Sequence, residues 1–477
     1  MEPAQRTPTI LTILGITGDL AAIKTLPALF NLAKSGELPS NFKIVGFGRK
    51  PFTNETFPTY VVERLQKRMP LETAEALFEF ASKIDYVQGN FDDVNSYNNL
   101  ALHLHKIEHA WEQLSHFIFY LAVPPEIYQP IIRNIRATPL YRDNDPEVQT
   151  RVIVEKPIGK DSASATVLEN LLTESFKSEE IYRIDHYLAK EMIQNILTFR
   201  FGNDLFEPNW NAQGIEKIEM KLWENFGVEK RGNFYDGLGA LRDVGQNHLL
   251  QMLALLTMEV PEEFSALSLH AKRAEVLNKL RPLTGEEMTT QTFRAQYVGY
   301  QDIEGVTPGS GTETYFKIKA YIDDERWDGV PIIVEAGKRL HEQRKEIIVT
   351  YKHRDPCWCR DKTNHDRNTI TFELEPTEGI IIKFWSKKPG YLPVREQRTI
   401  DFMLRSGADI PQYTEEYQKL LLDAILGDQT LFVSTAEIHA MWRFVDPIIE
   451  AWERGDVPLH SYVPDTDEAV EQSKNKI

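Results

Sequence analysis

Hydrophobic residues in the first two hundred positions occur in short continuous runs. The clearest runs cover residues 10–14, 43–48, 116–123 and 151–155, and the segments between them have apolar residues at helical spacing. A continuous apolar run is typical of a strand that is buried on both faces of a parallel sheet. Strands that alternate with helices predict a doubly wound α/β unit.

Beyond residue 203 the pattern changes to alternation with a period of two. It is clearest in residues 215–224, 313–322, 346–351, 369–374 and 379–384, with a further strand expected at 330–335. Such alternation predicts antiparallel strands covered on one face. Helices are expected at 415–426 and 435–454, and the polar residues 464–477 are expected to form a loose tail.

The first apolar run leads into a glycine turn, Gly15-Ile-Thr-Gly-Asp-Leu20, which an amphipathic stretch follows. A strand, a glycine turn and a helix form the context of a dinucleotide site, in which the backbone approaches the pyrophosphate at the helix N-terminus. The G-x-x-G spacing also fits a plain tight turn. The next strand ends at Arg49-Lys50, where a basic residue suits the 2′-phosphate of NADP. NADP is therefore the expected cofactor, with NAD at lower preference.

Together these patterns predict an α/β plus α+β protein. We expect a Rossmann-like, doubly wound dinucleotide-binding domain at residues 1–184. A larger α+β domain with a mostly antiparallel sheet is expected at residues 185–477, for substrate binding and oligomerisation.

Composition excludes several classes of function. A chain of 477 residues is long enough for two domains, and its net charge of −17 argues against nucleic-acid or anionic membrane partners. No apolar run approaches the length of a membrane span, and the first residues lack a secretory signal pattern. The two cysteines, Cys357 and Cys359, form no disulfide framework, so a cytoplasmic location is expected.

The segment 183–195 concentrates unlike chemical groups at one turn. Asp185, His186, Tyr187 and Lys190 follow a short strand at 180–182, and His186 and Lys190 are expected on one side of a first helical turn. A helix N-terminus with added imidazole, phenol and ammonium groups suits a phosphate dianion. The alternative is a solvated helix start with a structural aspartate cap.

Two further positions are candidates for chemistry. Lys156 follows the strand 151–155 and precedes Pro157, at the sheet edge where ligands of doubly wound folds bind; the alternative is a surface lysine. The apolar helix expected from 232 to 258 contains a polar group, Asp243-x-x-Gln246-Asn247-His248, which either ties the core together or serves a site. Asp243 and His248 are five apart and are not expected to face each other, so His248 needs a partner from elsewhere.

A metal site is not expected. His353, Cys357, Cys359 and His365 lie in one polar stretch, but C-x-C with distant histidines is not a usual zinc spacing. A loop is the better interpretation.

Several segments resemble the glucose-6-phosphate dehydrogenase family over most of the chain. The matching motifs are G-I-T-G-D-L at Gly15, V-E-K-P-I-G at Val154, R-I-D-H-Y-L-A-K-E-M-I-Q-N at Arg183, R-D-V-G-Q-N-H-L-L-Q-M at Arg242, A-G-K-R-L at Ala336, K-K-P-G at Lys387, D-Q-T-L-F-V at Asp428 and W-R-F-V-D-P at Trp442. The Arg183 and Arg242 motifs are highly specific as a pair.

The resemblance implies NADP-dependent oxidation of D-glucose 6-phosphate at C1 to 6-phospho-D-glucono-1,5-lactone, the first step of the oxidative pentose phosphate pathway. It implies that His248 is the general base and Asp185 its orienting partner. Substrate ligands by resemblance are Lys156, His186, Tyr187, Lys190, Glu224, Asp243 and Lys338. Coenzyme ligands by resemblance are Gly15, Thr17, Gly18, Asp19, Leu20, Arg49, Tyr128 and Lys156. Related enzymes are commonly homodimers or homotetramers.

The chain departs from the family pattern at three places. Gln343 stands where a basic residue is frequent, Glu375 stands where glutamine is frequent, and the lysine-rich start of the first helix is reduced to Ala21-Ala22-Ile23-Lys24. The departures at Gln343 and Glu375 keep one alternative open, the same chemistry on another sugar phosphate or free glucose. A second alternative is an NAD(P)H-binding regulatory or scaffold protein without turnover, which is disfavoured because Asp185, His248 and Lys156 retain their chemistry.

Overall fold

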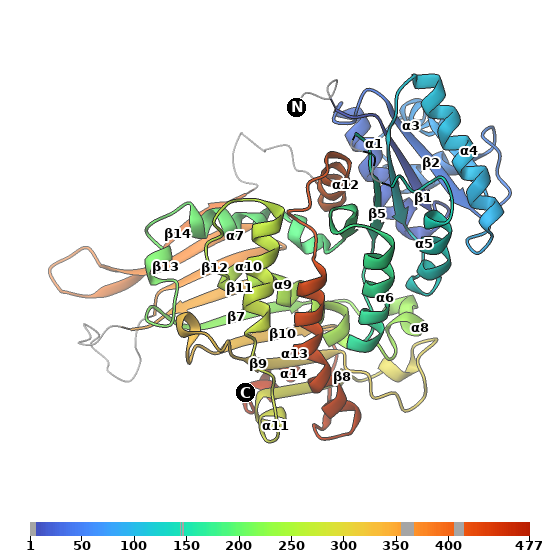
Figure 1. The fold of residues 1–477 in the computed structure, drawn as a ribbon. Coiled ribbons are helices and arrows are strands. Elements are labelled where there is room, and N and C mark those ends of the chain that lie inside the picture. The colour runs from blue at the N-terminus through green and yellow to red at the C-terminus, as the bar shows by residue number, and fades with distance from the viewer. Residues whose placement is uncertain (1–5, 144, 146, 354–366, 405–414) are drawn as a thin grey trace.

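The computed structural model describes residues 6–143, 145, 147–353, 367–404 and 415–477. Figure 1 shows two sheets, one formed by the first part of the chain and one by the later part, with helices packed on both. Cys357, Cys359 and His365 lie outside the described residues. None of the described helices is long and apolar enough to cross a membrane.

The first sheet is parallel throughout. Its six described strands have the order β3-β2-β1-β4-β5-β6, which is the order of a dinucleotide-binding sheet. They are β1 (Thr9–Leu14), β2 (Phe42–Gly48), β3 (Ile84–Gln88), β4 (His116–Leu121), β5 (Thr150–Val154) and β6 (Ile181–Arg183). The predicted α/β unit is confirmed.

Continuous hydrophobicity in these strands reflects burial on both faces. In β1, Ile10 and Leu14 join one core cluster, whereas Leu11 and Ile13 join another on the opposite face. Alternate side chains point to opposite faces of a sheet, so both faces must be covered. The helices packed around this sheet are α1 (Leu26–Lys34), α2 (Phe57–Arg68), α3 (Ala74–Ala81), α4 (Val94–Trp111), α5 (Tyr128–Arg136) and α6 (Ser162–Ser175).

The second sheet is mixed and mostly antiparallel, as predicted. Within the described residues it has nine strands in the order β14-β13-β12-β11-β7-β10-β9-β8-β15, and only the pairs β7–β10 and β8–β15 are parallel. The strands are β7 (Ile215–Trp223), β8 (Thr292–Tyr297), β9 (Tyr315–Ala320), β10 (Ile332–Gly337), β11 (Arg344–Tyr351), β12 (Thr369–Glu375), β13 (Gly379–Lys387), β14 (Arg395–Met403) and β15 (Leu459–Tyr462).

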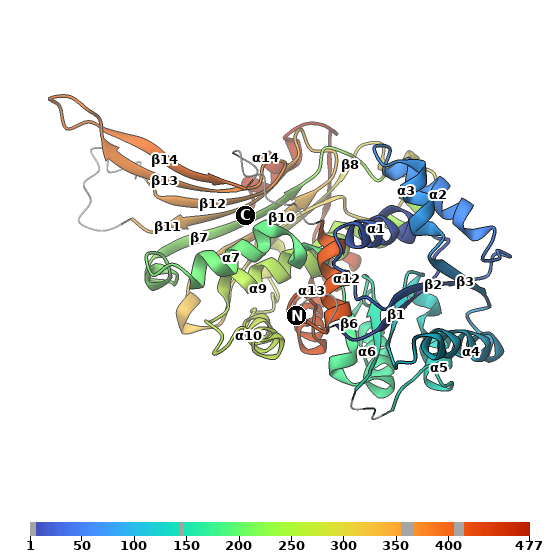
Figure 2. The same ribbon diagram turned by 90° about the horizontal axis from the view of Figure 1, so that it is seen from above.

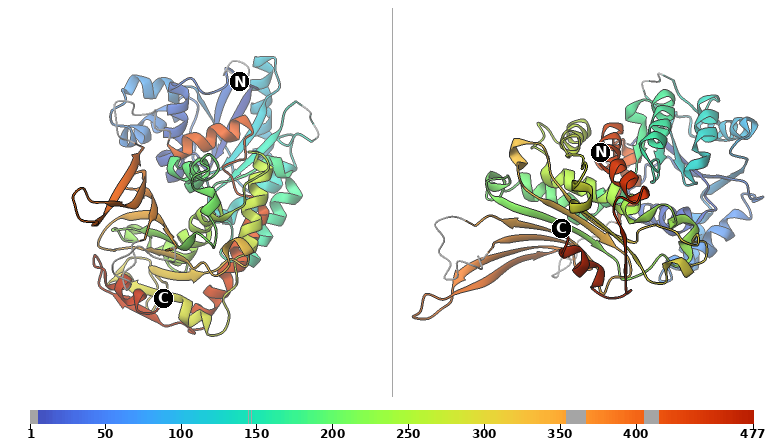
Figure 3. Two further views of the ribbon diagram at one scale, coloured as in Figure 1. Left: turned by 90° about the vertical axis from the view of Figure 1, so that its left-hand side faces the viewer. Right: turned by 90° about the horizontal axis from the view of Figure 1, so that it is seen from below.

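Helices cover one face of this sheet at its centre, while its β13–β14 end projects beyond them (Figures 2 and 3). Phe199 of α7, for example, packs its ring edge against Phe372 of β12, with centroids 5.3 Å apart. The helices that accompany this sheet are α7 (Glu191–Phe201), α8 (Gly232–Tyr235), α9 (Leu250–Thr257), α10 (Ala266–Asn278), α11 (Glu287–Gln291), α13 (Thr435–Glu453) and α14 (Glu468–Lys474).

The late helices return to the first sheet. Helix α12 (Glu416–Leu426) packs against α1 (Figure 2), and the Arg151 guanidinium of β5 donates to the carbonyl oxygens of Ala424 and Ile425 at 2.8 and 2.9 Å. In α13, the Trp442 indole donates to the Ile158 carbonyl at 3.0 Å. Residues far apart in the sequence therefore meet along the boundary between the two sheets.

The expected loose tail at 464–477 is wrong. Helix α14 buries Ala469 and Val470 in a core cluster, and the Ser473 hydroxyl lies 2.9 Å from the buried Tyr315 hydroxyl. So few apolar residues anchor this helix that the sequence shows no clear periodicity, although each of them is well buried.

Candidate active site

The turn after β6 is built by Asp185. Its Oδ1 accepts a hydrogen bond from the Tyr187 backbone N–H at 3.0 Å and caps a short 3₁₀ turn, His186–Ala189. Lys190 is then extended (φ −65°, ψ 132°) and caps α7, which begins at Glu191. The strand therefore does not pass straight into an α-helix, and the prediction that His186 and Lys190 share its first turn is wrong.

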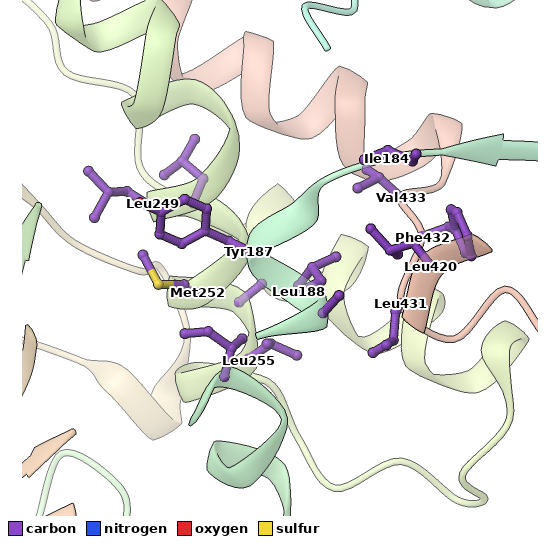
Figure 4. Close-up of a cluster of buried hydrophobic side chains, with 14 of the residues drawn as sticks. Ile184, Tyr187, Leu188, Leu249, Met252, Leu255, Leu420, Leu431, Phe432 and Val433 are labelled. Carbon is purple, nitrogen blue, oxygen red and sulfur yellow. The ribbon is translucent and has the colours of Figure 1, made fainter. Parts of the chain in front are cut away.

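This turn rests on a cluster of apolar side chains from three distant segments (Figure 4). Tyr187 lies on the side of Leu249 and Met252, Leu188 lies in the middle of the cluster, and Ile184 lies on the side of Leu420, Phe432 and Val433. All of these residues are buried. Close packing beneath the turn holds its polar side chains in fixed positions.

His248 lies on a π-helix, Leu241–Leu249, that joins α8 to α9 through the predicted polar group. Its imidazole is almost fully buried, and Nδ1 lies 2.5 Å from Asp185 Oδ1. The Asp185 carboxylate accepts a hydrogen bond from Nδ1–H, so the proton stays on Nδ1 and the Nε2 lone pair is free to accept. Nε2 lies 2.8 Å from the Lys156 ammonium nitrogen. Asp185, from the turn after β6, is therefore the partner from elsewhere in the chain that His248 was expected to need.

The π-helix also brings Asp243 and His248 to the same side. Lys156 Nζ donates to the Asp243 carbonyl at 2.9 Å while contacting His248, and it lies 3.7 Å from Asp243 Oδ1. In a π-helix the backbone bonds join residues five apart, so the wider turn superposes positions that an α-helix separates. Asp243 and His248 therefore both reach Lys156, although the partner of the His248 imidazole comes from Asp185, as expected, and not from Asp243.

The electrostatics favour a neutral imidazole. Burial, followed by the charge of Lys156, holds the pKa of His248 well below its ordinary value. Burial raises the pKa of Asp185, whose Oδ2 has no hydrogen-bond partner among the described residues. For Asp243, the charges of Lys156 and Lys338 outweigh the effect of burial and lower the pKa. An unprotonated Nε2 is the form that a general base needs.

A cavity of about 320 Å³ opens in front of Nε2. Its lining includes six of the predicted substrate ligands: Lys156, His186, Tyr187, Glu224, Asp243 and Lys338. It also includes Asn247, which belongs to the predicted polar group, and residues that were not predicted as ligands: Arg231, Arg242 and Lys345. Lys345 had a usable signal, because the alternation of β11 places it on the opposite face from Arg344 and Glu346.

Opposite charges alternate along the far wall of this cavity. Lys338 Nζ is 2.6 Å from Glu224 Oε2 and 3.6 Å from Asp243 Oδ2, and it is almost fully buried. Carboxylates and ammonium groups held this closely can accept from and donate to neighbouring hydroxyls of a sugar.

Lys190 is the predicted substrate ligand that does not line the cavity. Its ammonium lies between Glu375 Oε1 at 2.8 Å and Glu416 Oε1 at 2.7 Å, and the side chain is buried. The predicted phosphate site therefore contains internal acids beside its lysines.

The glycine turn after β1 has the close packing that a dinucleotide site requires. Gly15 has φ +88°, and a Cβ there would lie 2.6 Å from the Ala122 carbonyl oxygen, so only glycine fits without strain. The Gly18 N–H donates to the Gly15 carbonyl at 2.8 Å, and the Thr17 carbonyl accepts from the Tyr60 hydroxyl at 2.9 Å. Beyond Leu20 the chain enters a helical segment, Ala21–Thr25.

The remaining coenzyme candidates differ in their accessibility. Asp19 is largely exposed and pairs with Arg64, and Arg49 is exposed at the end of β2, with its guanidinium over the Phe91 ring. Tyr128, in contrast, is fully buried, and its hydroxyl accepts from the Glu155 backbone N–H at 3.2 Å. Its place in the core beneath the strand ends argues against the predicted contact with a coenzyme.

The ligand atoms of Asp185, His186 and His248 lie within 4.8 Å of one another. Such a group could hold a cation, but Asp185 and His248 already share a hydrogen bond, and Lys156 brings a positive charge to the other ring nitrogen of His248, Nε2. The donor set fits proton transfer better than metal binding.

Comparison with known proteins agrees with this geometry. Residues 12–195 match the family "Glucose-6-phosphate dehydrogenase, NAD binding domain", and residues 197–475 match "Glucose-6-phosphate dehydrogenase, C-terminal domain". The chain is 36% identical over 467 residues to a glucose-6-phosphate 1-dehydrogenase of Chlamydia muridarum, covering 94% of this chain and 91% of that one. It is 37% identical over 481 residues to that of Treponema pallidum, covering 95% and 91%.

Solved structures give the same result. A glucose-6-phosphate dehydrogenase in complex with its substrate glucose-6-phosphate superposes with a TM-score of 0.90 at 33% identity, covering 99% of both chains. A glucose-6-phosphate 1-dehydrogenase from Mycobacterium avium superposes with a TM-score of 0.84 at 30% identity, covering 98% of both chains. The present chain belongs to the glucose-6-phosphate dehydrogenase family.

Proposed function

We propose that the protein oxidises D-glucose 6-phosphate at C1 to 6-phospho-D-glucono-1,5-lactone with NADP, as the first step of the oxidative pentose phosphate pathway. One observation carries this proposal. The His248–Asp185 pair faces a polar cavity beside Lys156, and Lys156 follows the carboxyl end of β5 in the dinucleotide-binding sheet. Coenzyme and sugar would meet at that edge.

The chain's own residues supply proton transfer and orientation. The C1 hydroxyl takes the position at His248 Nε2 that Lys156 now occupies, and Lys156 then donates to a sugar oxygen. Nε2 accepts the hydroxyl proton while Asp185 stabilises the imidazolium that forms. A bound nicotinamide would supply the hydride acceptor for C1, so that C1 would become the lactone carbonyl. Glu224, Asp243 and Lys338 hold the other hydroxyls.

The phosphate group would bind at the turn after β6. His186 and Tyr187 line the cavity there together with Lys345, and Lys190 lies directly behind them. Burial, followed by the charge of His248, holds the pKa of His186 well below its ordinary value, so its imidazole is neutral before an anion arrives. The lysines supply the charge that a dianion requires.

The test is formation of NADPH, followed by absorbance, with purified protein and NADP. We expect turnover with glucose 6-phosphate and a much lower kcat/KM with glucose or galactose 6-phosphate. A higher kcat/KM with another sugar phosphate would identify that compound as the substrate instead. Coenzyme binding without turnover on any of them would favour a regulatory protein.

Coenzyme preference gives a separate prediction for Arg49. Arg49→Ala should raise the KM for NADP by about ten- to a hundredfold, because a guanidinium–phosphate contact is lost, and should change the KM for NAD little. Initial rates with both coenzymes measure this. Lys106→Ala, which removes an exposed charge on α4, is the control. An equal rise in the KM values for NADP and NAD would show that Arg49 does not bind the 2′-phosphate.

We also propose that the protein is a homodimer or homotetramer that associates through the outer part of its second sheet. On β14, Ile400 and Phe402 are 59% and 53% exposed and lie opposite Ile382 and Ile380 of β13. They continue the apolar face of the sheet beyond the covering helices, and such patches favour association.

Light scattering after size exclusion should give a mass of two or four chains, and Ile400→Glu with Phe402→Glu should lower that mass. Thr399→Glu, on the other face of the same strand, should not. An unchanged mass in the double variant would place the interface elsewhere.

A further inference from the structure

Glu375 connects both lysines of the proposed phosphate site. It ends β12, and its Oε1 accepts from Lys190 Nζ at 2.8 Å while its Oε2 lies 2.7 Å from Lys345 Nζ. The Gln343 amide also donates to Oε2 at 3.1 Å. A single carboxylate thus engages three donors with its two oxygens, as a phosphate would.

The same lysines face Tyr187, which connects them to the catalytic base. Lys190 Nζ and Lys345 Nζ lie 5.2 and 5.8 Å from the Tyr187 ring centroid. The Tyr187 ring is stacked on the His248 imidazole, with centroids 4.1 Å apart. The Glu375 cluster therefore lies one side chain away from the base, on the side where the phosphate of a sugar would reach.

The ion pairs control which lysine is accessible. Lys345 lines the cavity, whereas Lys190 is enclosed by Glu375 and Glu416 and does not. A phosphate dianion that binds both Lys190 and Lys345 must replace the ion pairs that Glu375 makes with them. A ligand without a phosphate needs no such exchange.

We propose that Glu375 is an internal anion that competes with the substrate phosphate for Lys190 and Lys345, and so lowers the discrimination between a 6-phosphorylated sugar and the free sugar. This inference rests on the proposed function, because it assigns a specificity role within that same site. Glu375 is a positioning residue that acts through the two lysines.

Competition of this kind holds across the working pH range. Burial alone would raise the pKa of Glu375, but the charges of Lys345 and Lys190 outweigh it and lower the pKa. Glu416, the Tyr187 hydroxyl, His186 and Lys24 lie beside the cluster. The pKa of Glu416 is likewise lowered, that of Tyr187 is raised well above its ordinary value by burial and by Glu375, and that of His186 is held low by burial. Glu375 and Glu416 therefore stay ionised near neutral pH, so the exchange is one of ion pairs.

The test compares Glu375→Gln with the wild type on glucose 6-phosphate and on D-glucose. Removing the competing charge should lower the KM for glucose 6-phosphate by about tenfold, the effect of one charged contact, with kcat and the KM for glucose nearly unchanged. Inorganic phosphate, used as a competitive inhibitor, should bind more tightly by a similar factor. Glu346→Gln is the matched control, because Glu346 pairs with Lys221 at 3.0 Å on the opposite face of β11.

Other outcomes would overturn the proposal. A higher KM for glucose 6-phosphate would mean that Glu375 holds the lysines in place for the substrate, and an unchanged KM would mean that it does not compete. If the glutamine variant does not fold, Glu375→Asp, which withdraws the carboxylate, should lower the KM by a smaller factor. Calorimetric titration with inorganic phosphate tests the competition even if neither protein turns over glucose 6-phosphate, a result that would refute the proposed function alone.

Discussion

Replacing His248 with asparagine is expected to lower kcat by roughly a hundredfold to ten-thousandfold, the usual effect of losing a general base. The KM values for glucose 6-phosphate and NADP should stay close to those of the wild type. Asparagine is polar and smaller than histidine, so the cavity keeps its lining, but no group remains that can take the C1 proton. Steady-state kinetics with the pure variant measure both parameters.

The pH profile separates this role from a structural one. Because burial and Lys156 lower the pKa of His248, its neutral form persists below the ordinary histidine range, and kcat/KM should fall only at still lower pH. The His248→Asn variant should not show this fall of kcat/KM at low pH. His270→Asn is the control, since His270 is a partly buried histidine that bonds to the Gln429 carbonyl away from the cavity. A large rise in KM with little change in kcat would show that His248 binds substrate instead.

Asp185→Asn is the second substitution with a large expected effect, a loss of about a hundredfold to a thousandfold in kcat. Asp185 Oδ1 accepts from both Tyr187 N–H and His248 Nδ1. An asparagine oxygen can keep both bonds, with its amide group in the position of Oδ2, which has no partner among the described residues. The substitution therefore removes mainly the charge that stabilises the imidazolium.

A double variant shows whether the two residues act as a unit. In the His248→Asn background, Asp185→Asn should lower kcat little further. Asp185 acts through the His248 imidazole, so its effect on kcat is already lost when that imidazole is absent. Additive losses would mean that Asp185 serves the reaction through another residue. Thermal unfolding of each variant reports any separate effect on the fold.

How far the sequence predicts this fold depends on the element. β1 and β4 are buried on both faces, so their apolar runs identify them directly. β14 is exposed along most of its length and is rich in charged residues, so no apolar pattern marks it. β15 has only four residues and is recognisable only by its pairing with β8. A run of several buried apolar residues produces the sequence signal, and strands without such a run are missed.

The candidate site shows the same limit. Motifs identified six of the seven predicted substrate ligands correctly as residues around the cavity, because the chemistry requires particular residue types there. They did not reveal the π-helix that superposes Asp243 and His248, since that geometry depends on packing. Nor did they show that Lys190 is enclosed by two acids, because Glu375 and Glu416 come from segments about two hundred residues later.

The return of α12 and α13 to the first sheet has a consequence for biosynthesis. A ribosome makes β1 to β6 early, but the helix that covers α1 and supplies Glu416 to Lys190 emerges only near the end of translation. Until then the nascent first unit exposes apolar surface that α12 later covers, a condition under which chaperones bind. Chains that terminate before residue 416 should therefore be removed by proteolysis, because the surface that α12 covers stays exposed in them.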